Sequence, residues 1–158
     1  MKQLQYTMKT TAGQLYLVAS ARGLEGIYWR RQPLKVVKRL DLQDPAAKIL
    51  SGTVQQLEEY FAGERKNFDI ALNGSGTVFQ QKVWAELCKI PYGKTAAYKD
   101  IAKRIKNPKA VRAVGTANGK NPFCIIIPCH RVIAADGSIG GYGGGIPAKE
   151  RLLKLEQK

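Results

Sequence analysis

One short stretch of the chain, residues 125–132, combines residue types that can do nucleophilic chemistry. An apolar run stops at Pro128, and Cys129 and His130, the only histidine of the chain, follow directly. A thiolate is a strong nucleophile, and a histidine can remove a thiol proton near neutral pH. A free cysteine is also often a small buried apolar residue. The stretch therefore indicates either a reactive thiol or a filled core position.

Glu156 is a candidate partner for His130. It follows Leu152 by four residues and Leu153 by three in a predicted helix of about 147–156, so it shares their inward face. An inward carboxylate is costly unless it is paired. A carboxylate on one ring nitrogen of His130 would fix the tautomer and make the other nitrogen a better base. A solvated glutamate near the end of the chain is the alternative.

A direct contact between Cys129 and His130 is not expected. Side chains of adjacent residues in extended backbone point to opposite sides, so His130 would take the thiol proton through a water molecule. The same geometry argues against a cysteine protease, in which the cysteine and the histidine come from separate elements and face each other.

Residues 1–72 predict an α/β domain that would hold no chemistry of its own. Three apolar runs before residue 30 are separated by turn residues and predict a strand meander. Asp44 and Pro45 predict the start of a helix that continues to Gly63. Its inward face is expected to carry Leu50, Val54, Leu57 and Phe61. Residues 68–72 alternate in polarity and predict a further strand.

The stretch Asn73–Gly76 is the one flexible, linker-like segment, and it predicts the boundary between two domains, residues 1–76 and 77–158. The second domain is expected to be mainly helical. Thr77 and Gln80 form a capping box for a helix that ends near Cys88. The buried face of this helix is expected to carry Phe79, Val83 and Leu87.

Two further helices are predicted over about 97–105 and 107–118, the second capped by Asn107 with Pro108 in its first turn. Two short helices joined by a few residues suggest a helix-turn-helix. From Lys94 to Lys120 the chain carries eight basic residues and one acidic residue. This composition favours a DNA-binding pair of helices over a plain helical hairpin.

The charge of the whole chain supports the same partner. The formal net charge is +14, and residues 77–158 contribute +10 of it, with 15 Lys and Arg against 5 Asp and Glu. Basic side chains that bind phosphates release condensed counterions, so a polyanion is the natural partner. A surface that only keeps the protein in solution is the alternative.

The second of these helices offers few long polar side chains that could read base edges. We expect Val111 and Val114 to pack inward and Arg112 to project. The small residues Ala110, Ala113 and Ala117 would then lie against a DNA groove. This pattern indicates recognition of a lesion or of DNA shape, with a side chain entering the base stack. A simple phosphate contact by Arg112 is the alternative.

Beyond this helix, residues 123–127 predict a buried strand that ends at Pro128, and Asp136–Gly137 predicts a turn. Residues 140–145 hold Tyr142 among five glycines. No Gly-Lys-Ser/Thr follows, so the segment does not fit a phosphate-binding loop. It indicates either the rim of a pocket for a flat ligand or a flexible surface turn.

The three cysteines include no C-x-x-C pair, and a single histidine cannot complete the usual zinc site, so neither a disulfide framework nor a metal or other cofactor is expected. No apolar run is long enough to cross a membrane, and the N-terminus lacks the pattern of a secretory signal. Free thiols suit a reducing compartment, so a cytoplasmic location is predicted.

These motifs together carry a resemblance to a known family. From about Phe79 to Glu156, roughly half of the chain resembles the O6-alkylguanine-DNA alkyltransferases, also called methylated-DNA–protein-cysteine methyltransferases. Three segments match the family in order. They are the recognition-helix motif Arg112–Gly115, the hinge Asn121–Pro122 and the active-site motif Pro128–Val132. Residues 1–72 resemble the family only in outline, as a ribonuclease-H-like α/β domain, and the helix-turn-helix of the second domain would be winged-helix-like.

The resemblance implies that Cys129 accepts the alkyl group irreversibly, so each molecule acts once. His130 would activate Cys129 through water, and Glu156 would orient His130. Tyr98 would donate a hydrogen bond to the guanine ring as the base leaves, and Asn121 would brace the active-site loop. The substrate pocket would be formed by Tyr98, Val132, Tyr142, Gly143 and Gly144, and the carbonyl groups of Cys129 and Val132 would receive the exocyclic amine.

For DNA, the resemblance implies that Arg112 enters the duplex in place of the flipped nucleotide, with small residues in the minor groove. The DNA-binding residues would be Thr95, Lys109, Ala110, Arg112, Ala113 and Gly115. The partner would be double-stranded DNA that contains O6-alkylguanine, bound by a monomer without an obligate protein partner.

Two positions depart from the family pattern. Gly143 stands where many members have serine, and Cys124 stands where proline or an aliphatic residue is expected; we interpret Cys124 as a core residue. The alkyltransferase-like proteins carry tryptophan at the cysteine position, so Cys129 argues against that subgroup. A noncatalytic DNA-binding module with a structural Cys129 is the competing hypothesis.

Overall fold

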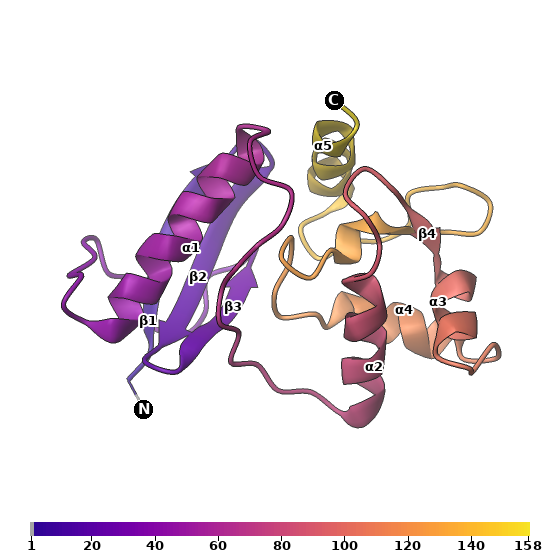
Figure 1. The fold of residues 1–158 in the computed structure, drawn as a ribbon, viewed down its shortest axis with the longest axis horizontal. Coiled ribbons are helices and arrows are strands. Elements are labelled where there is room, and N and C mark those ends of the chain that lie inside the picture. Colours follow the sequence, from indigo (N-terminus) through magenta and orange to yellow (C-terminus); the bar gives the residue numbers. More distant parts are fainter. Residues whose placement is uncertain (1) are drawn as a thin grey trace. The chain divides into compact units, whose positions relative to one another are not determined.

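The computed structural model describes residues 2–158, and the chain forms two compact units, residues 1–74 and 75–158 (Figure 1). The division falls inside the stretch Asn73–Gly76. The first unit contains a small sheet and one long helix, whereas the second unit is mainly helical. This coarse division into a sheet domain and a helical domain agrees with the sequence prediction.

The first unit is built on an antiparallel meander of three strands, β1 (Leu4–Thr10), β2 (Gly13–Ser20) and β3 (Gly23–Tyr28), in the order β1-β2-β3. The predicted meander is confirmed. Helix α1 (Pro45–Phe61) packs on this sheet (Figure 1). The core of the first unit contains the fully buried residues Leu15, Leu17, Leu24, Ile27, Leu50 and Leu57.

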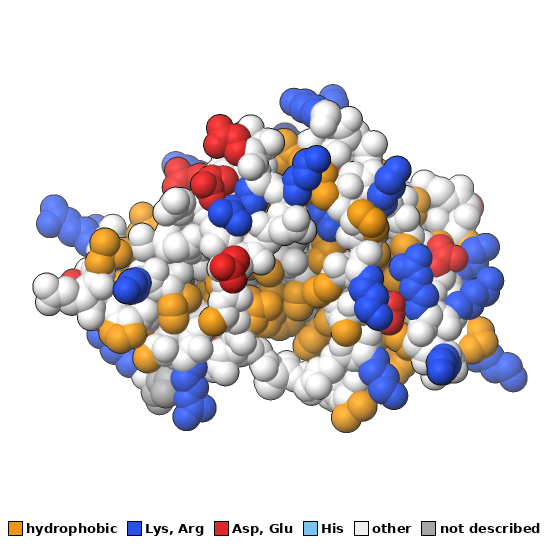
Figure 2. All heavy atoms as spheres, in the orientation of Figure 1, with side chains coloured by type: hydrophobic (Ala, Val, Ile, Leu, Met, Phe, Trp, Pro, Cys, Tyr) orange, Lys and Arg blue, Asp and Glu red, His pale blue; other side chains and the backbone are white. Residues whose placement is uncertain are grey.

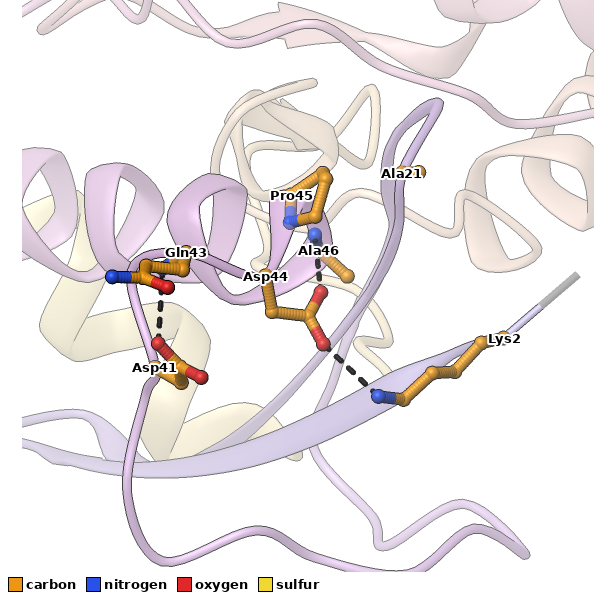
Figure 3. A pocket seen from close by; sticks show the side chains of 7 residues that line it. All are labelled: Lys2, Ala21, Asp41, Gln43, Asp44, Pro45 and Ala46. Carbon is orange, nitrogen blue, oxygen red and sulfur yellow. Dashed lines mark hydrogen bonds and ion pairs between the residues drawn. The ribbon is translucent and has the colours of Figure 1, made fainter.

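Helix α1 begins where the sequence predicts, because the Asp44 side chain accepts a hydrogen bond from the Ala46 N–H at 2.9 Å. The same carboxylate pairs with Lys2 at 3.0 Å, and Asp41 accepts from the Gln43 N–H nearby (Figure 3). These residues line a shallow pocket. Its carboxylates are already used for capping and for an exposed ion pair, so it offers no reactive group.

Two expectations for the first unit are wrong. The buried face of α1 includes Thr53 and Tyr60, whereas Val54 and Phe61 are only partly buried. Thr53 can be buried because its hydroxyl donates to the Ile49 carbonyl at 2.8 Å. Residues 68–72 form a single bridge, between Leu72 and Leu24, and no strand.

The side chain of Gln56 explains the missing strand. It accepts a hydrogen bond from the Asp69 N–H at 2.9 Å and donates to the Asp69 carbonyl at 3.0 Å. These are the backbone groups that a strand ladder would have used. The segment is therefore held by helix α1 and meets β3 at one point only.

The second unit contains four helices, a 3-10 turn and a two-stranded parallel ladder. In chain order these elements are α2 (Val78–Leu87), β4 (Ala96–Ala97), α3 (Tyr98–Arg104), α4 (Val111–Gly119), η1 (Cys129–Arg131), β5 (Val132–Ile133) and α5 (Ile146–Glu156). The Thr77–Gln80 capping box is present at the start of α2, as predicted. Helices α2 and α3 both pack on α4. These contacts determine which side of α4 is left exposed. On α2, Val83 and Leu87 are buried with Trp84, whereas Phe79 is only partly buried.

The predicted start of the helix over residues 107–118 is wrong, because α4 begins at Val111 and not at Asn107. The Asn107 N–H bonds to the Ala102 carbonyl at 2.9 Å, and Lys106 has a left-handed φ of 60°. The chain must therefore turn once more before a new helix can start, and the Ala110 N–H bonds to the Asn107 carbonyl at 3.0 Å in that turn.

The later start changes which residues of α4 face outward. Val111 is 36% exposed, so its predicted inward packing is wrong, whereas Val114 is buried as expected. Ala117 is buried and does not lie on the outer surface. The exposed side of α4 carries Val111, Arg112, Ala113 and Thr116.

The predicted strand over residues 123–127 is also wrong. Four of its five residues are buried, but they form a turn in which Ile125 has a φ of 75° and the Ile127 N–H bonds to the Phe123 carbonyl at 2.9 Å. Asn121 closes this turn from both ends. It accepts from the Phe123 N–H at 3.0 Å and donates to the Ile127 carbonyl at 2.7 Å. Within the described part of the chain, no helix is long and apolar enough to span a membrane.

Candidate active site

Cys129 opens the 3-10 turn η1 directly after Pro128, and its side chain is buried. The predicted position at the end of a strand is wrong, since the Cys129 N–H bonds to the Ile127 carbonyl and the Arg131 N–H to the Pro128 carbonyl. These short-range bonds form a 3-10 turn over residues 129–131 in place of a strand. Cys129 and His130 are therefore not adjacent residues of an extended strand, and the argument from alternating sides does not apply to them.

Burial raises the pKa of the Cys129 thiol. A hydrogen bond from the Asn121 side chain opposes this rise most strongly, followed by the positive charge of Lys149 and a hydrogen bond with Tyr142. The net direction is upward, so the thiol is mostly protonated at neutral pH. A base must remove its proton before it can act as a nucleophile.

His130 is the candidate for that base. Its Nε2 lies 2.7 Å from the Glu156 Oε2, and both side chains are buried. Burial lowers the pKa of His130, although Glu156 opposes this change, so the imidazole is neutral near pH 7. We assign the proton to Nε2, which donates to the carboxylate. The buried Nδ1 then keeps a lone pair and has no hydrogen-bond partner among residues 2–158.

Arg131 completes this arrangement and was not foreseen from the sequence. Its Nε donates to the Glu156 Oε1 at 2.8 Å, its Nη2 to Oε2 at 3.1 Å, and its Nη1 to the Ile90 carbonyl at 2.8 Å. The guanidinium also lies over the Tyr92 ring, 5.7 Å from its centroid. The buried charge of Glu156 is thus balanced by Arg131, and His130 can remain neutral beside it.

The advantage that His130 gives to thiol chemistry at Cys129 should therefore hold from pH 7 down to the ordinary histidine pKa, about 6.5, and fall only at lower pH. Because burial lowers the His130 pKa, the free imidazole persists below that value. The measurement is the rate of modification of Cys129 against pH in the wild type divided by the rate in a His130→Gln variant, so that the ionisation of the thiol itself cancels. A ratio that already declines between pH 8 and 6.5 would contradict the assignment.

Three side chains, those of Tyr98, Tyr142 and Cys124, interact with the Cys129 thiol. Tyr98 lies close enough for the charge of Cys129 to raise its pKa, after the larger effect of burial. Tyr142 hydrogen-bonds to the thiols of Cys129 and Cys124 and lowers both pKa values. Burial raises the pKa of Cys124 well above its ordinary value, so this second thiol stays protonated. Cys124 is buried, as expected of a core residue, but it also borders the acceptor thiol.

Two backbone carbonyl groups at the site already accept hydrogen bonds. The Cys129 carbonyl accepts from the Val132 N–H and, at 3.4 Å, from the Asn118 side chain, and the Val132 carbonyl accepts from the Lys149 Nζ at 2.6 Å. A further donor to the Cys129 carbonyl would have to replace the long bond from Asn118, since a carbonyl oxygen has two lone pairs. Gly143 is exposed and Gly144 partly buried in the loop that follows.

The predicted DNA-binding residues lie at the surface of the second unit, whereas the Cys129 thiol is buried. Arg112, Ala113, Lys109 and Thr95 are exposed, and Ala110 and Gly115 are half-buried. The Arg112 guanidinium makes no hydrogen bond or ion pair with any described residue. Figure 2 shows that basic side chains outnumber acidic ones over the region of α2 and α3. A side-chain group able to hold a metal ion is absent from residues 2–158.

Lys149 is the second functional candidate that sequence reasoning missed. It is fully buried, and its ammonium bonds to carbonyl groups beside Cys129. A signal was present in the sequence, because Lys149 precedes Leu152 by three residues and Glu156 by seven and so shares their inward face. The bond between Arg131 and Glu156 had no such signal, because it depends on how η1 and α5 pack.

The fold and the site define a group-transfer protein that uses a buried thiol, on a helical domain with a basic surface. Comparison with known proteins gives the family. A family model described as the 6-O-methylguanine DNA methyltransferase DNA binding domain matches residues 78–158. A second, described as the ribonuclease-like domain of the same methyltransferases, matches residues 4–73.

The chain is also similar to named proteins over nearly its whole length. A methylated-DNA–protein-cysteine methyltransferase of Methanosarcina barkeri is 44% identical over 155 residues, which cover 95% of this chain and 94% of that protein. The protein of the same name from Mycobacterium tuberculosis is 47% identical over 151 residues, covering 96% and 90%. The crystal structure of Mycobacterium tuberculosis OGT in complex with DNA has a TM-score of 0.82 at 44% identity, covering 98% and 92%. The chain belongs to the 6-O-methylguanine DNA methyltransferase family.

Proposed function

We propose that this protein repairs double-stranded DNA by transferring the methyl group, or a larger alkyl group, from O6-alkylguanine to the Sγ atom of its own Cys129. The observation that carries the proposal is the buried Cys129 beside a neutral His130 that Glu156 holds by one ring nitrogen at 2.7 Å. The family and the names of its similar members support the same reaction.

The reaction balances with groups that the site holds. A water molecule passes the thiol proton to the Nδ1 of His130, and the sulfur attacks the alkyl carbon. The new S–C bond forms as the C–O6 bond breaks, and the electron pair stays on the guanine. Tyr98 donates a hydrogen bond to the departing ring and offsets its negative charge. The thioether is stable, so each molecule acts once.

Base positioning uses backbone and loop groups of the same unit. The exocyclic amine of the guanine donates to the Val132 carbonyl and to the Cys129 carbonyl, where it replaces the long bond from Asn118. Asn121 supports the turn before Cys129 through its two bonds to Phe123 and Ile127. Tyr142 forms a wall of the pocket, and Gly143 offers its N–H to O6 where a serine hydroxyl is missing.

DNA binding is assigned to residues 77–158, in which α3 and α4 act as a winged-helix-like helix-turn-helix, while residues 1–76 form a ribonuclease-H-like domain with its linker. The small residues of α4, with Lys109 and Thr95 at phosphates, would lie in the minor groove. Arg112 would enter the stack and replace the flipped nucleotide, since extrusion of a base costs a few kcal/mol that inserted groups must offset. A reduced Cys129 suits the cytoplasm.

The proposal is tested by the intact mass of the protein after mixing with a duplex that contains one O6-methylguanine. We expect the mass to rise by one methyl group, with the modification on the peptide that carries Cys129. An unmodified duplex gives no change. A protein that binds the lesion duplex but keeps its mass would be a noncatalytic DNA-binding module, and the proposal would be wrong.

Arg112→Ala should lower the rate of methyl transfer more than it lowers affinity for undamaged duplex. The exposed guanidinium acts on extrusion of the base, whereas one lost phosphate contact weakens binding to all sequences alike. Transfer rate and duplex affinity are measured together, with Arg104→Ala, an exposed arginine of α3, as the matched control. Equal losses of rate and affinity would make Arg112 an ordinary phosphate contact.

A further inference from the structure

Two buried hydrogen-bond acceptors belong to residues that adjoin Cys129. Asn118, on the inner face of α4, is 5% exposed, and His130 is fully buried in η1. The Asn118 Oδ1 and the His130 Nδ1 have no hydrogen-bond partner among residues 2–158. An amide oxygen can only accept, and the His130 Nδ1 offers a lone pair because the ring proton is on Nε2, at Glu156. Both atoms therefore need a donor.

The Asn118 side chain is turned so that its Nδ2 donates to the Cys129 carbonyl at 3.4 Å. The opposite orientation would set the amide oxygen against that carbonyl oxygen, and two acceptors would face each other. The backbone supports the same placement, because the Asn121 N–H bonds to the Asn118 carbonyl at 3.3 Å in the turn that leads to Cys129. Oδ1 is therefore the acceptor that Asn118 still offers, on a side chain that touches the residue preceding His130.

An asparagine at this position is costly unless Oδ1 finds a donor. Asparagine is a poor helix former, and a buried polar atom without a partner loses the hydrogen bonds that water gave it in the unfolded chain. Leucine has nearly the same shape and would carry neither cost. Buried polar groups in native proteins are nearly always paired, with protein groups or with ordered water. The two acceptors beside the thiol therefore indicate a bound molecule that donates to both.

We propose that Asn118 is a positioning residue for alkyl transfer, whose Oδ1 holds, together with the His130 Nδ1, the water molecule that takes the proton from Cys129. The inference rests on the proposed function, because it assigns a further residue to the proton path of the same site.

One water molecule meets the needs of all three groups. It has two donors, which match the Asn118 Oδ1 and the His130 Nδ1, and its oxygen can accept from the Cys129 thiol. Neither acceptor hydrogen-bonds directly to the thiol or to any other described group, so the proton has to pass through a bridging molecule. Buried waters typically make about three such bonds to polar groups that have no other partner.

Asn118 decides which hydrogen of the water moves. The S–H bond of Cys129 breaks as its proton joins the water oxygen, and the hydrogen that faces His130 moves to Nδ1, so the water molecule is restored. The hydrogen that faces Asn118 stays, because an amide oxygen is a very weak base. Without Oδ1 the water would turn and would donate to His130 only part of the time. When the guanine amine takes the Cys129 carbonyl, Nδ2 loses its long bond, and the water at Oδ1 keeps the amide in place.

The test is a double-mutant cycle between Asn118→Leu and His130→Gln. Two rates are measured at pH 7, methyl transfer from saturating O6-methylguanine duplex and modification of the Cys129 peptide by iodoacetamide without DNA. In the wild-type background we expect Asn118→Leu to lower both rates about tenfold, a part of the hundredfold or more that general base catalysis contributes. In the His130→Gln background it should lower neither rate by more than about twofold, because the water then has no base to serve.

The matched control is Asn107→Leu, which removes an exposed asparagine from the turn before α4. It should match the wild type in both rates. If Asn118→Leu does not fold, as judged by urea unfolding, Asn118→Ala takes its place in the cycle under the same criterion.

Equal losses in the two backgrounds would overturn the inference, because Asn118 would then only support the fold. Wild-type rates in the Asn118 variant would overturn it as well. The iodoacetamide cycle needs no DNA, so it decides the role of Asn118 even if the wild-type protein takes up no methyl group. That last result would contradict the proposed function alone.

Discussion

Cys129→Ser should abolish methyl uptake from O6-methylguanine duplex, while duplex binding stays within about twofold of the wild type. Serine has nearly the same shape, so the buried turn η1 should keep its packing. A hydroxyl is a far weaker acid than a thiol, and the neutral His130 cannot ionise it to a useful extent. The measurement is the intact mass after long incubation with excess duplex.

The matched control for this experiment is Cys124→Ser. Cys124 is buried next to the acceptor, and burial raises its pKa well above that of a free thiol, with the charge of Cys129 as a further cause. It should not accept an alkyl group, so Cys124→Ser should gain one methyl group like the wild type. A methyl group found on Cys124, or uptake by Cys129→Ser, would contradict the assignment of the acceptor.

Glu156→Gln should cause the second large loss, in stability and in rate together. The amide leaves the Arg131 guanidinium buried without its carboxylate, which costs about 3 to 5 kcal/mol of unfolding free energy. It also removes the negative charge that orients and supports His130 as a base. Since general base catalysis contributes about a hundredfold or more, the transfer rate should fall by at least about that factor.

Unfolding of the second unit can be followed separately. Trp84 is buried there and donates to the Ala117 carbonyl at 2.8 Å, so its fluorescence in urea reports on this unit once Trp29 is replaced by phenylalanine. The control is Glu150→Gln, which changes an exposed glutamate of α5. It should alter neither the unfolding free energy nor the transfer rate. An unfolding free energy of Glu156→Gln equal to that of the control would show that the buried ion pair does not stabilise the fold.

Local signals were sufficient for much of this protein. Asp44 caps α1 and Thr77 caps α2 as predicted, because capping depends on residues within one turn of each other. The inward position of Glu156 also followed from helix periodicity, and the structure brings it to His130. The predicted start of α4 was wrong, because the residue types do not reveal the left-handed conformation of Lys106 or the hydrogen bond from Asn107 to Ala102.

The sequence by itself determined the two-part organisation, the basic second half and the residue types of the site, since these depend on composition, caps and short spacings. Only the tertiary structure decided the backbone conformation at Cys129. An apolar run such as 123–127 predicts burial, but it forms a strand only where a neighbouring strand can pair with it. It also decided the charges around the thiol. Arg131 meets Glu156 across 25 residues and Lys149 meets Val132 across 17, and only packing of η1, β5 and α5 brings these groups together.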